Sequence, residues 1–321
     1  VFDSDSNVKN QQVLNYLDRT KAILLDVQEI RNELFDSRGN VLVQKIATFT
    51  DETLSTLLDV KVITNENLDA LGNASRVTIL KYAAGFIDAQ GYIQYSNFMD
   101  GTVIETSIFD LRGNALAQTV RKYSDEALAA LIETQAITSS YDMRDRQVHS
   151  RIITTNSLGS FVDRQEIDYL SYDAYGNVVD QDIARYGETD ALIDYKVIHN
   201  EYLDPLAARR GNATHTTITR FADIAKTLEI ERQEISNLSF DLKGNIVDQR
   251  IDLYVASTFV RETLIHNSNI SPQGDAGNQE ITGFITDALG ALIETSYQYI
   301  TNRVFDSDSN VKNQQVLNYL D

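Results

Sequence analysis

The stretch FDSRGN, at Phe35–Asn40, decides the fold. Its Asp suits the first position of a type I turn, where the carboxylate can accept a backbone N–H, and its Gly suits the left-handed residue of a G1 bulge. Together they predict a tight β-hairpin. Similar stretches are LDALGN (68–73), FDLRGN (109–114), YDAYGN (172–177) and FDLKGN (240–245). We expect the following residues to form turns: Asp36, Gly39, Asn40, Asp69, Gly72, Asp110, Gly113, Asp173, Gly176, Asp241 and Gly244.

This turn motif recurs along the whole chain. Weaker copies end at Arg146, Asn212, Asn278, Asn7 and Asn310, and successive motifs lie 31 to 41 residues apart. The same 18 residues, VFDSDSNVKNQQVLNYLD, stand at 1–18 and again at 304–321. Residues 1–303 therefore read as one super-repeat of nine hairpin units, and 304–321 as the start of the next copy. We expect the sequence to be an excerpt of a longer tandem array.

A bulged turn also predicts the strand register. The residue that lies k positions before the Asp should face the residue k positions after the Asn. Six positions out, the predicted pairs are Ile30–Ile46, Ile63–Ile79, Ile104–Val120, Ile167–Ile183, Ile198–Ile218, Ile235–Ile251 and Ile300–Val316. Four positions out, they are the amide pairs Asn32–Gln44, Asn237–Gln249 and Asn302–Gln314. Near Arg146 the spacing differs by one residue, because Ile137 stands five before Asp142, so we expect a slip or bulge there.

The segments that join one hairpin to the next have a different composition. TDETLSTLL (50–58) and SDEALAALI (124–132) combine helix-capping residues, acids and spaced leucines, which predicts one or two helical turns. The third unit carries an insert, 83–101, in which 87–97 could form an extra hairpin. The expected fold is therefore mainly β: tandem hairpin repeats of about 33 residues with short helical connectors, forming an elongated spiral sheet or solenoid.

Composition narrows the classes of partner. With 321 residues and 42% hydrophobic residues the chain should bury a core, and its net charge of −19 argues against nucleic acid or an anionic membrane as partner. Cysteine is absent, which excludes disulfides and thiolate metal sites. The sequence contains no run of about 18 apolar residues, so we expect no membrane span. The expected partner is another copy of the chain or an adjacent repeat.

The turn-centred third of each unit resembles a known family. YDAYGNVVDQ and FDLKGNIVDQ are similar to the YD repeats of the rearrangement-hotspot (Rhs) and teneurin-like proteins. The resemblance implies β-hairpins wound into a long spiral sheet, in a protein that is secreted or displayed at a cell surface. This chain departs from the family in its longer period and in its expected helical connectors.

The sequence offers little catalytic chemistry. His149, His199, His215 and His266 are not at metal-ligand spacing, and no nucleophile elbow or phosphate loop is present, so we expect no enzyme and no catalytic residue. The repeated aspartates could be mistaken for acid/base residues, but a residue that occurs in every copy of a turn is best explained as holding that turn. Two interpretations of DSDSN (3–7) stay open: a calcium loop with oxygen ligands on Asp3, Asp5 and Asn7, or a degenerate turn in which Ser6 replaces the Gly. Calcium is thus the one candidate cofactor.

Architecture then suggests function. Repeats of this length bury their faces only against neighbours, and near-identical long copies suit a rope-like protein. We therefore expect a structural segment of a giant secreted or cell-surface filament, fibre or stalk, located outside the cell and elongating end to end. The alternative is a repetitive adhesin, in which the insert with Tyr92 and Tyr95 contacts a glycan or a protein. Three sequons, at Asn73, Asn212 and Asn237, would permit glycosylation.

Overall fold

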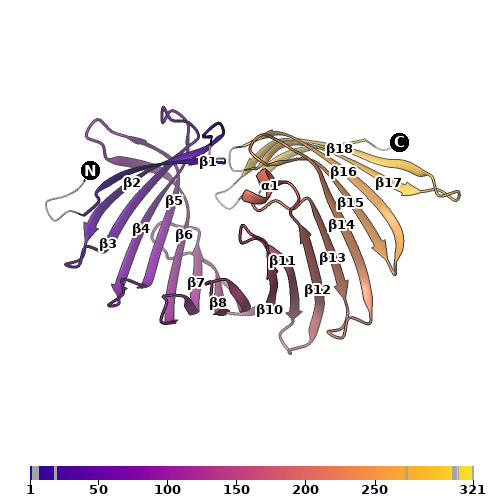
Figure 1. The fold of residues 1–321 in the computed structure, drawn as a ribbon, viewed down its shortest axis with the longest axis horizontal. Coiled ribbons are helices and arrows are strands. Elements are labelled where there is room, and N and C mark those ends of the chain that lie inside the picture. The colour runs from indigo at the N-terminus through magenta and orange to yellow at the C-terminus, as the bar shows by residue number, and fades with distance from the viewer. Residues whose placement is uncertain (2–6, 18–19, 272–273, 306–308, 310, 320–321) are drawn as a thin grey trace. The chain divides into compact units, whose positions relative to one another are not determined.

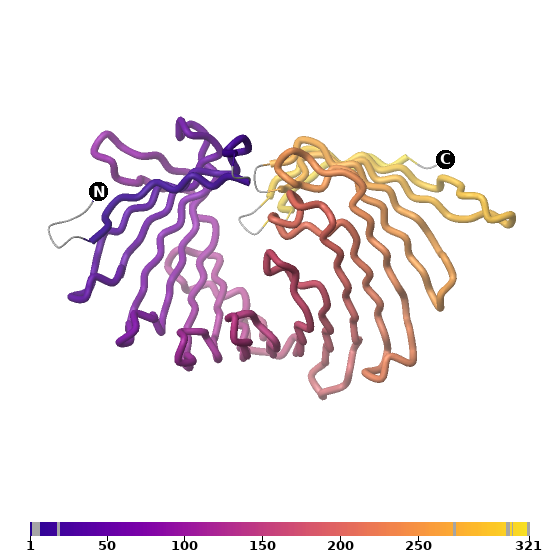
Figure 2. Tube along the Cα trace, viewed as in Figure 1, coloured from indigo at the N-terminus to yellow at the C-terminus, as the bar shows by residue number. Residues whose placement is uncertain are grey.

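The computed structural model describes residues 1–321 except 2–6, 18–19, 272–273, 306–308, 310 and 320–321. The chain forms two compact units, Val1–Arg164 and Gln165–Asp321, and each is built almost entirely from β-hairpins (Figure 1). Within each unit, successive hairpins lie side by side along the chain (Figure 2). The mainly β, tandem-hairpin fold expected from the sequence is thus confirmed.

Nineteen strands lie among the described residues. In the first unit they are β1 (Asn10–Tyr16), β2 (Leu24–Phe35), β3 (Val41–Phe49), β4 (Leu57–Leu68), β5 (Ala74–Ile87), β6 (Ile93–Phe109), β7 (Ala115–Tyr123), β8 (Leu131–Tyr141) and β9 (Gln147–Asn156). The boundary between the units falls within β10 (Phe161–Tyr172). In the second unit they are β11 (Val178–Tyr186), β12 (Leu192–Glu201), β13 (His215–Phe221), β14 (Glu229–Phe240), β15 (Ile246–Val255), β16 (Thr258–Ile270), β17 (Ala276–Thr286), β18 (Leu292–Phe305) and β19 (Val311–Tyr319).

Each of these strands from β1 to β9, and from β11 to β19, pairs antiparallel with the next. The β-branched pairs are opposed as predicted, for example Ile30 with Ile46 and Ile235 with Ile251. The same holds for Ile63–Ile79, Ile104–Val120, Ile198–Ile218 and Ile300–Val316. The Ile167–Ile183 pair involves β10 and stays a prediction. The turn chemistry therefore sets which residues share a face.

The slip expected in the hairpin that turns near Arg146 is also confirmed. In β2–β3 two register shifts near the turn cancel, so the strands return to the register that the turn predicts. In β8–β9 a single shift, between Ser140 and Tyr141, is left uncompensated, and Ile137 consequently faces Ile152. The missing residue before Asp142 is thus accommodated by one bulge beside the turn.

The connectors differ from the prediction: those at 51–56, 125–130 and 223–228 are wide turns, that at 187–191 is a tight turn, and none of these is helical. Asp51 accepts hydrogen bonds from the backbone N–H groups of Ser55 and Thr56, four and five residues later. The chain then closes through Leu54 in the left-handed conformation (φ 57°), with an N–H from Thr50 to the carbonyl of Thr56. Adjacent strands lie only about 5 Å apart, so the connector must reverse direction where a helix would lead away. Asp125 with Leu128, and Asp223 with Lys226, repeat this arrangement.

The one helix among the described residues lies in a hairpin turn, not in a connector. α1 (Pro205–Arg209) fills the lengthened turn between β12 and β13, begins at Pro205 and is capped by the Asp204 carboxylate. A second correction concerns the motif ending at Asn278. The turn between β16 and β17 closes at 271–275 around Gly274, and Asn278 lies within β17. Among the described residues, no helix has the length and apolarity to cross a membrane.

The insert 83–101 extends β5 and β6 into a longer hairpin. Its strands pair Ala84 with Ser96 and Ile87 with Ile93, and its turn is closed by Asp88, which accepts the backbone N–H of Tyr92. Ile93 is 1% exposed and belongs to the core of the first unit. The other members of this buried cluster are Val27, Ala47, Phe49, Val60 and Tyr82. The insert therefore covers one face of the sheet, which gives this unit an apolar core.

Candidate functional site: the turn edge

The hairpin turns share one hydrogen-bonded geometry. In the turn 36–40, Asp36 Oδ1 accepts the backbone N–H groups of Arg38 (2.8 Å) and Asn40 (2.9 Å), while Oδ2 accepts Asn40 Nδ2 (2.9 Å). Gly39 has a φ of 83°. The carboxylate therefore satisfies two N–H groups that the ladder cannot reach, and it also orients the Asn side chain. The same contacts recur in the turns 69–73, 110–114, 173–177 and 241–245.

These hydrogen bonds favour the charged form of the turn aspartates. The Asn40 side chain, helped by the backbone N–H groups, lowers the pKa of Asp36 to about 2. Asn114 acts in the same way on Asp110, whose pKa is about 2, and the guanidinium of Arg146 lowers the pKa of Asp142 to about 2. The pKa of Asp69 is likewise lowered, chiefly by Asn73. The carboxylates of these four turns are thus committed to their turns as anions.

Within each unit, a turn also contacts the next turn along the chain. The Asn side chain of one turn lies over the Gly of the following one, so a Cβ atom at Gly72 would be 3.0 Å from Asn40 Oδ1. A Cβ atom at Gly113 would be 2.9 Å from Asn73 Oδ1. The Gly is therefore required twice, for its left-handed backbone and for this close approach. We call these rows of contacting turns, from 36–40 to 142–146 in the first unit and from 173–177 to 241–245 in the second, the turn ladder of each unit.

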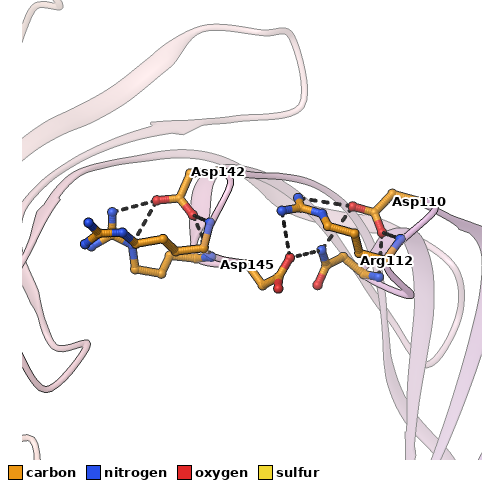
Figure 3. Close-up of polar contacts among 7 residues, drawn as sticks. Asp110, Arg112, Asp142 and Asp145 are labelled. Atoms are coloured by element: carbon orange, nitrogen blue, oxygen red, sulfur yellow. Dashed lines mark hydrogen bonds and ion pairs between the residues drawn. The ribbon is translucent and has the colours of Figure 1, made fainter.

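Figure 3 shows how the turn ladder continues where the Gly is missing. In the turn 142–146, Asp145 takes the left-handed position with a φ of 61°. Its carboxylate accepts Asn114 Nδ2 at 2.8 Å and pairs with Arg112 Nη1 at 2.9 Å, so the preceding turn bonds to it directly. A short polar side chain that tolerates the left-handed region thus replaces the Gly contact with a hydrogen bond.

A second contact between repeats lies four residues before several of the turns. Asn65 Nδ2 donates to the backbone carbonyl of Val41, 24 residues earlier, at 3.0 Å. The pairing of β3 with β4 ends at Val43, so the Val41 carbonyl lies beyond the ladder and the side chain satisfies it. We call these contacts the amide latch. Its described members are Asn32 to Val8, Asn65 to Val41, Asn200 to Val178, Asn237 to Ala213 and Asn267 to Ile246, at 2.6–3.1 Å.

The amide pairs predicted from the register act on this latch. Gln44 Nε2 donates to Asn32 Oδ1 at 2.7 Å, and Gln249 Nε2 donates to Asn237 Oδ1 at 2.8 Å. The Gln thus orients the Asn whose Nδ2 reaches the neighbouring repeat. Asn302 donates to Gln315 instead of to the predicted Gln314. The pair of Asn267 with Gln279 was not predicted, because the motif ending at Asn278 placed the turn three residues too late. The signal for this pair was the Asn four residues before the turn at 271–275.

The three sequons fall within these contacts. Asn73 Nδ2 donates to Asp69, Asn212 Nδ2 donates to the carbonyl of Gly244, and Asn237 Nδ2 donates to the carbonyl of Ala213. A glycan would be attached through this same nitrogen. Glycosylation would therefore compete with the contacts that join the repeats.

Two of the histidines belong to repeated polar clusters. His199 Nδ1 lies 2.6 Å from Asp180 Oδ1, and the other carboxylate oxygen accepts the hydroxyl of Ser171. Ser239, Asp248 and His266 form the same cluster. The hydroxyl and the imidazole lower the pKa of the Asp in both clusters. The carboxylate lies between hydroxyl and imidazole, so this arrangement differs from one in which a base activates a nucleophile.

The insert brings Tyr92 and Tyr95 to different environments. Tyr92 is 59% exposed, whereas Tyr95 is 37% exposed and its ring lies 4.4 Å from that of Tyr82. Beside Tyr92 is a hollow of 470 Å³ lined by polar groups, and Arg31 Nε donates across it to the carbonyl of Gly91 at 2.7 Å. Tyr92 is therefore the more accessible of the two candidate binding residues.

The candidate calcium residues are only partly described. Asp3 and Asp5 lie outside the described residues. Asn7 takes the place of a turn Asn, because a Cβ atom at Gly39 would lie 2.6 Å from its Oδ1. In the described part of the chain, no cluster of three Asp, Glu or His side chains is arranged to hold a metal ion.

Comparison with known proteins found no matching family model and no matching curated protein. Among solved structures, the chain is similar to the crystal structure of TcdB2-TccC3-TEV, with 10% identity and a TM-score of 0.21 over 99% of this chain. It is also similar to the Photorhabdus luminescens Tc holotoxin pore, with 11% identity and a TM-score of 0.16 over 96% of this chain. The chain spans about a fifth of the length of those chains.

Proposed function

We propose that this chain is a structural repeat segment of a giant secreted or cell-surface fibrous protein, which assembles through stacking of its repeats. One observation carries the proposal: the amide latch joins successive repeats in both units by the same side chain at the same distance from the turn. In each of these contacts, the Asn side chain of one repeat donates to a backbone carbonyl of the repeat before it. The YD-repeat resemblance of the turns supports a place outside the cell.

This proposal is tested by lengthening the array. A chain in which residues 1–303 occur twice before 304–321 should fold as a continuous set of hairpins, because the duplicated unit meets the neighbours that it already has. Small-angle scattering should show that the maximum dimension grows by the length of one copy. Hydrogen exchange should be slow in the strands on both sides of the junction. Two separate bodies joined by an unprotected junction would contradict the structural function.

A second function, a repetitive adhesin, is favoured by the hollow beside Tyr92. An exposed aromatic ring next to Arg31 and Asn32 combines a stacking surface with hydrogen-bonding groups. A sugar could stack on the ring and bind the polar groups through its hydroxyls. Glycan-array binding that is lost on Tyr92→Ala but kept on Tyr175→Ala, a Tyr of similar exposure (52%) in the second unit, would support it. Equal binding by both variants would argue against this site.

A further inference from the structure

The contact between β18 and the preceding repeat is made by a different side chain from the amide latch. In the described members of the latch, an Asn donates to the carbonyl that directly follows the preceding turn. Asn302 is the equivalent Asn of β18, but it donates to Gln315. The carbonyl of Ala276, which follows the turn at 271–275, instead accepts Arg303 Nη1 at 3.1 Å. A guanidinium therefore replaces the amide at this position.

An enlarged bulge gives Arg303 this direction. Asn302 is in the left-handed region, with a φ of 55°, and the pairing of β18 with β19 passes from Thr301 directly to Val304. The gap thus spans two residues of β18, whereas the equivalent gap in β2 spans one. Because a bulge changes the direction of the side chains within it, Arg303 reaches the preceding repeat.

The Arg303 guanidinium is stacked and partly desolvated. Its Cζ lies 5.0 Å from the centre of the Phe305 ring. Its Nε is buried and, among the described residues, has no hydrogen-bond partner. Burial lowers the pKa of Arg303, and the charge of the nearby Asp275 offsets this effect only in part. An anion beside this guanidinium would therefore meet a charge that the protein has not neutralised.

Other arginines of the second unit have this charge neutralised. Arg232 is the best match to Arg303, because its guanidinium lies 4.5 Å from the centre of the Tyr254 ring and its Nε is also buried without a hydrogen bond. Arg232, however, forms an ion pair with Glu234 at 3.1 Å. In the part of the chain that the structure describes, Arg303 has no carboxylate partner of this kind.

A polar hollow of 360 Å³ lies beside Arg303. Small-molecule sites in proteins have volumes of about 300–1,000 Å³, so the hollow is large enough for more than a bare ion. Among the described residues that line it, the charged ones are Arg210, Arg303 and Asp275, which gives a net positive charge in a chain whose net charge is −19. The wall also contains the amide side chains of Asn212, Asn245, Gln249, Asn267 and Gln279.

These amides have hydrogen-bonding groups beyond those that join the repeats. A side-chain amide has two N–H donors and a carbonyl acceptor. The described contacts use one N–H of Asn267 and one of Gln279. Hydroxyl groups both donate and accept hydrogen bonds, so they suit such a wall. The ligand that fits the hollow therefore combines an oxyanion with several hydroxyls.

We propose that this hollow binds a sugar acid, whose carboxylate lies against the Arg303 guanidinium and whose hydroxyls contact the amides. Arginine and carboxylate form strong, charge-assisted hydrogen bonds, and the loss of water from a stacked guanidinium strengthens them. The site lies within the second unit and is separate from the hollow beside Tyr92. It does not depend on the structural function proposed above.

Titration of the full chain with glucuronate, followed by saturation-transfer NMR, tests this site. Arg303→Gln should weaken binding about tenfold, because it removes the charge but keeps an amide that can donate to Ala276. Arg232→Gln, at the matched arginine that pairs with Glu234, should leave binding unchanged. Unchanged glucuronate binding by Arg303→Gln would overturn the inference.

Asp275→Asn should change binding in the opposite direction. It removes the one negative charge among the described residues that line the hollow, so glucuronate should bind severalfold more tightly. Asn is also the residue at the equivalent place of the turn 36–40, so the turn should tolerate the change. If Arg303→Gln loses hydrogen-exchange protection in β17 and β18, this variant decides the outcome. Unchanged or weaker binding by Asp275→Asn would then contradict the site.

Glucose and acetate separate the two parts of the ligand. Glucose lacks the carboxylate and acetate lacks the hydroxyls, so each should bind much more weakly than glucuronate. Glucose that binds as well as glucuronate would show that the Arg303 charge is not used, and acetate that binds as well would show that the amides are not used. Either result would overturn the proposal.

Discussion

At the scale of single residues, the turn ladder depends on an Asp, a Gly and an Asn at fixed spacing. The Asp satisfies backbone N–H groups, the Gly adopts a conformation that costs other residues energy, and the Asn extends to the next turn. A comparison of Gly72 with Gly91 separates the need for a left-handed backbone from the need for space beside the preceding Asn. Their φ values are +89° and +84°, but only at Gly72 would a Cβ atom approach a neighbouring side chain, that of Asn40.

Gly72→Ala should therefore destabilise the protein more than Gly91→Ala. Both substitutions place a Cβ in the left-handed region, at about 1–2 kcal/mol. Only Gly72→Ala also displaces the Asn40 side chain, which weakens its hydrogen bond to Asp36 and adds to the loss of stability. Urea unfolding of the two variants measures the difference. Equal midpoints would show that the Asn contact adds nothing to the backbone effect.

The turn aspartates predict a loss of stability in acid. The pKa values of Asp36 and Asp110 are lowered to about 2 in the folded chain, so the contribution of these two residues is full above the unfolded pKa of about 3.9 and is lost as the pH falls toward 2. NMR titration of the Asp36 carboxyl carbon should give a pKa of about 2. The shift should persist in 1 M salt, because its largest cause is the neutral Asn40 amide. A pKa near 4 would contradict this account.

At the scale of elements, the amide latch determines how one hairpin attaches to another. Its acceptor carbonyls lie just beyond the last pair between neighbouring hairpins, so the side chain continues a ladder that the backbone has ended. The Gln on the same hairpin orients the Asn from the opposite strand. Removal of the Asn should therefore destabilise the protein more than removal of the Gln, because only the Asn reaches the neighbouring repeat.

Asn237→Ala should cost about 1–3 kcal/mol, because it leaves the Ala213 carbonyl without its side-chain donor. Gln249→Ala removes only the bond within the hairpin and should cost about 0.5–1.5 kcal/mol. Thermal unfolding of the two single variants and of the double variant forms a complete cycle. The double variant should be less destabilised than the sum of the two single variants, since both affect the same Asn. Strict additivity would mean that the Gln does not orient the latch.

At the scale of the whole molecule, the two units bury different residues. The first unit has an apolar cluster closed by the insert through Ile93. In the second unit, buried carboxylates take part: Asp182 is 8% exposed and accepts the hydroxyl of Tyr195 and the ammonium of Lys226. Burial also raises the pKa of the Tyr195 hydroxyl, with the Asp182 carboxylate adding to the effect. In an array where each repeat contacts mainly its neighbours, such differences should remain local.

Ile93→Ala should therefore weaken the first unit alone. Truncating this buried side chain should cost about 2–5 kcal/mol, whereas Phe86→Ala, at a ring that is 61% exposed on the same insert, should change stability by less than about 0.5 kcal/mol. Hydrogen exchange should show faster exchange in β2–β6 and unchanged exchange in β12–β18. A loss of protection in both units would show that the array unfolds as one body.

The sequence by itself determined the hairpins, their turns and most of their register. These depend on residues within a few positions of one another, such as Asp36, Gly39 and Asn40, whose hydrogen bonds close locally and recur in every repeat. Even the irregular hairpin at Asp142 was predictable, because a missing residue in a strand must appear as a bulge beside the turn.

Only the tertiary structure decided what joins the repeats. The connectors look helical in composition, but the short distance between adjacent strands makes them reverse through left-handed residues such as Leu54 and Lys226. The latch acceptors lie 24 residues or so before their donors and carry no side-chain signature, because any residue has a carbonyl. Which carbonyl is left without a ladder partner depends on where neighbouring hairpins diverge, and that is a property of the assembled sheet.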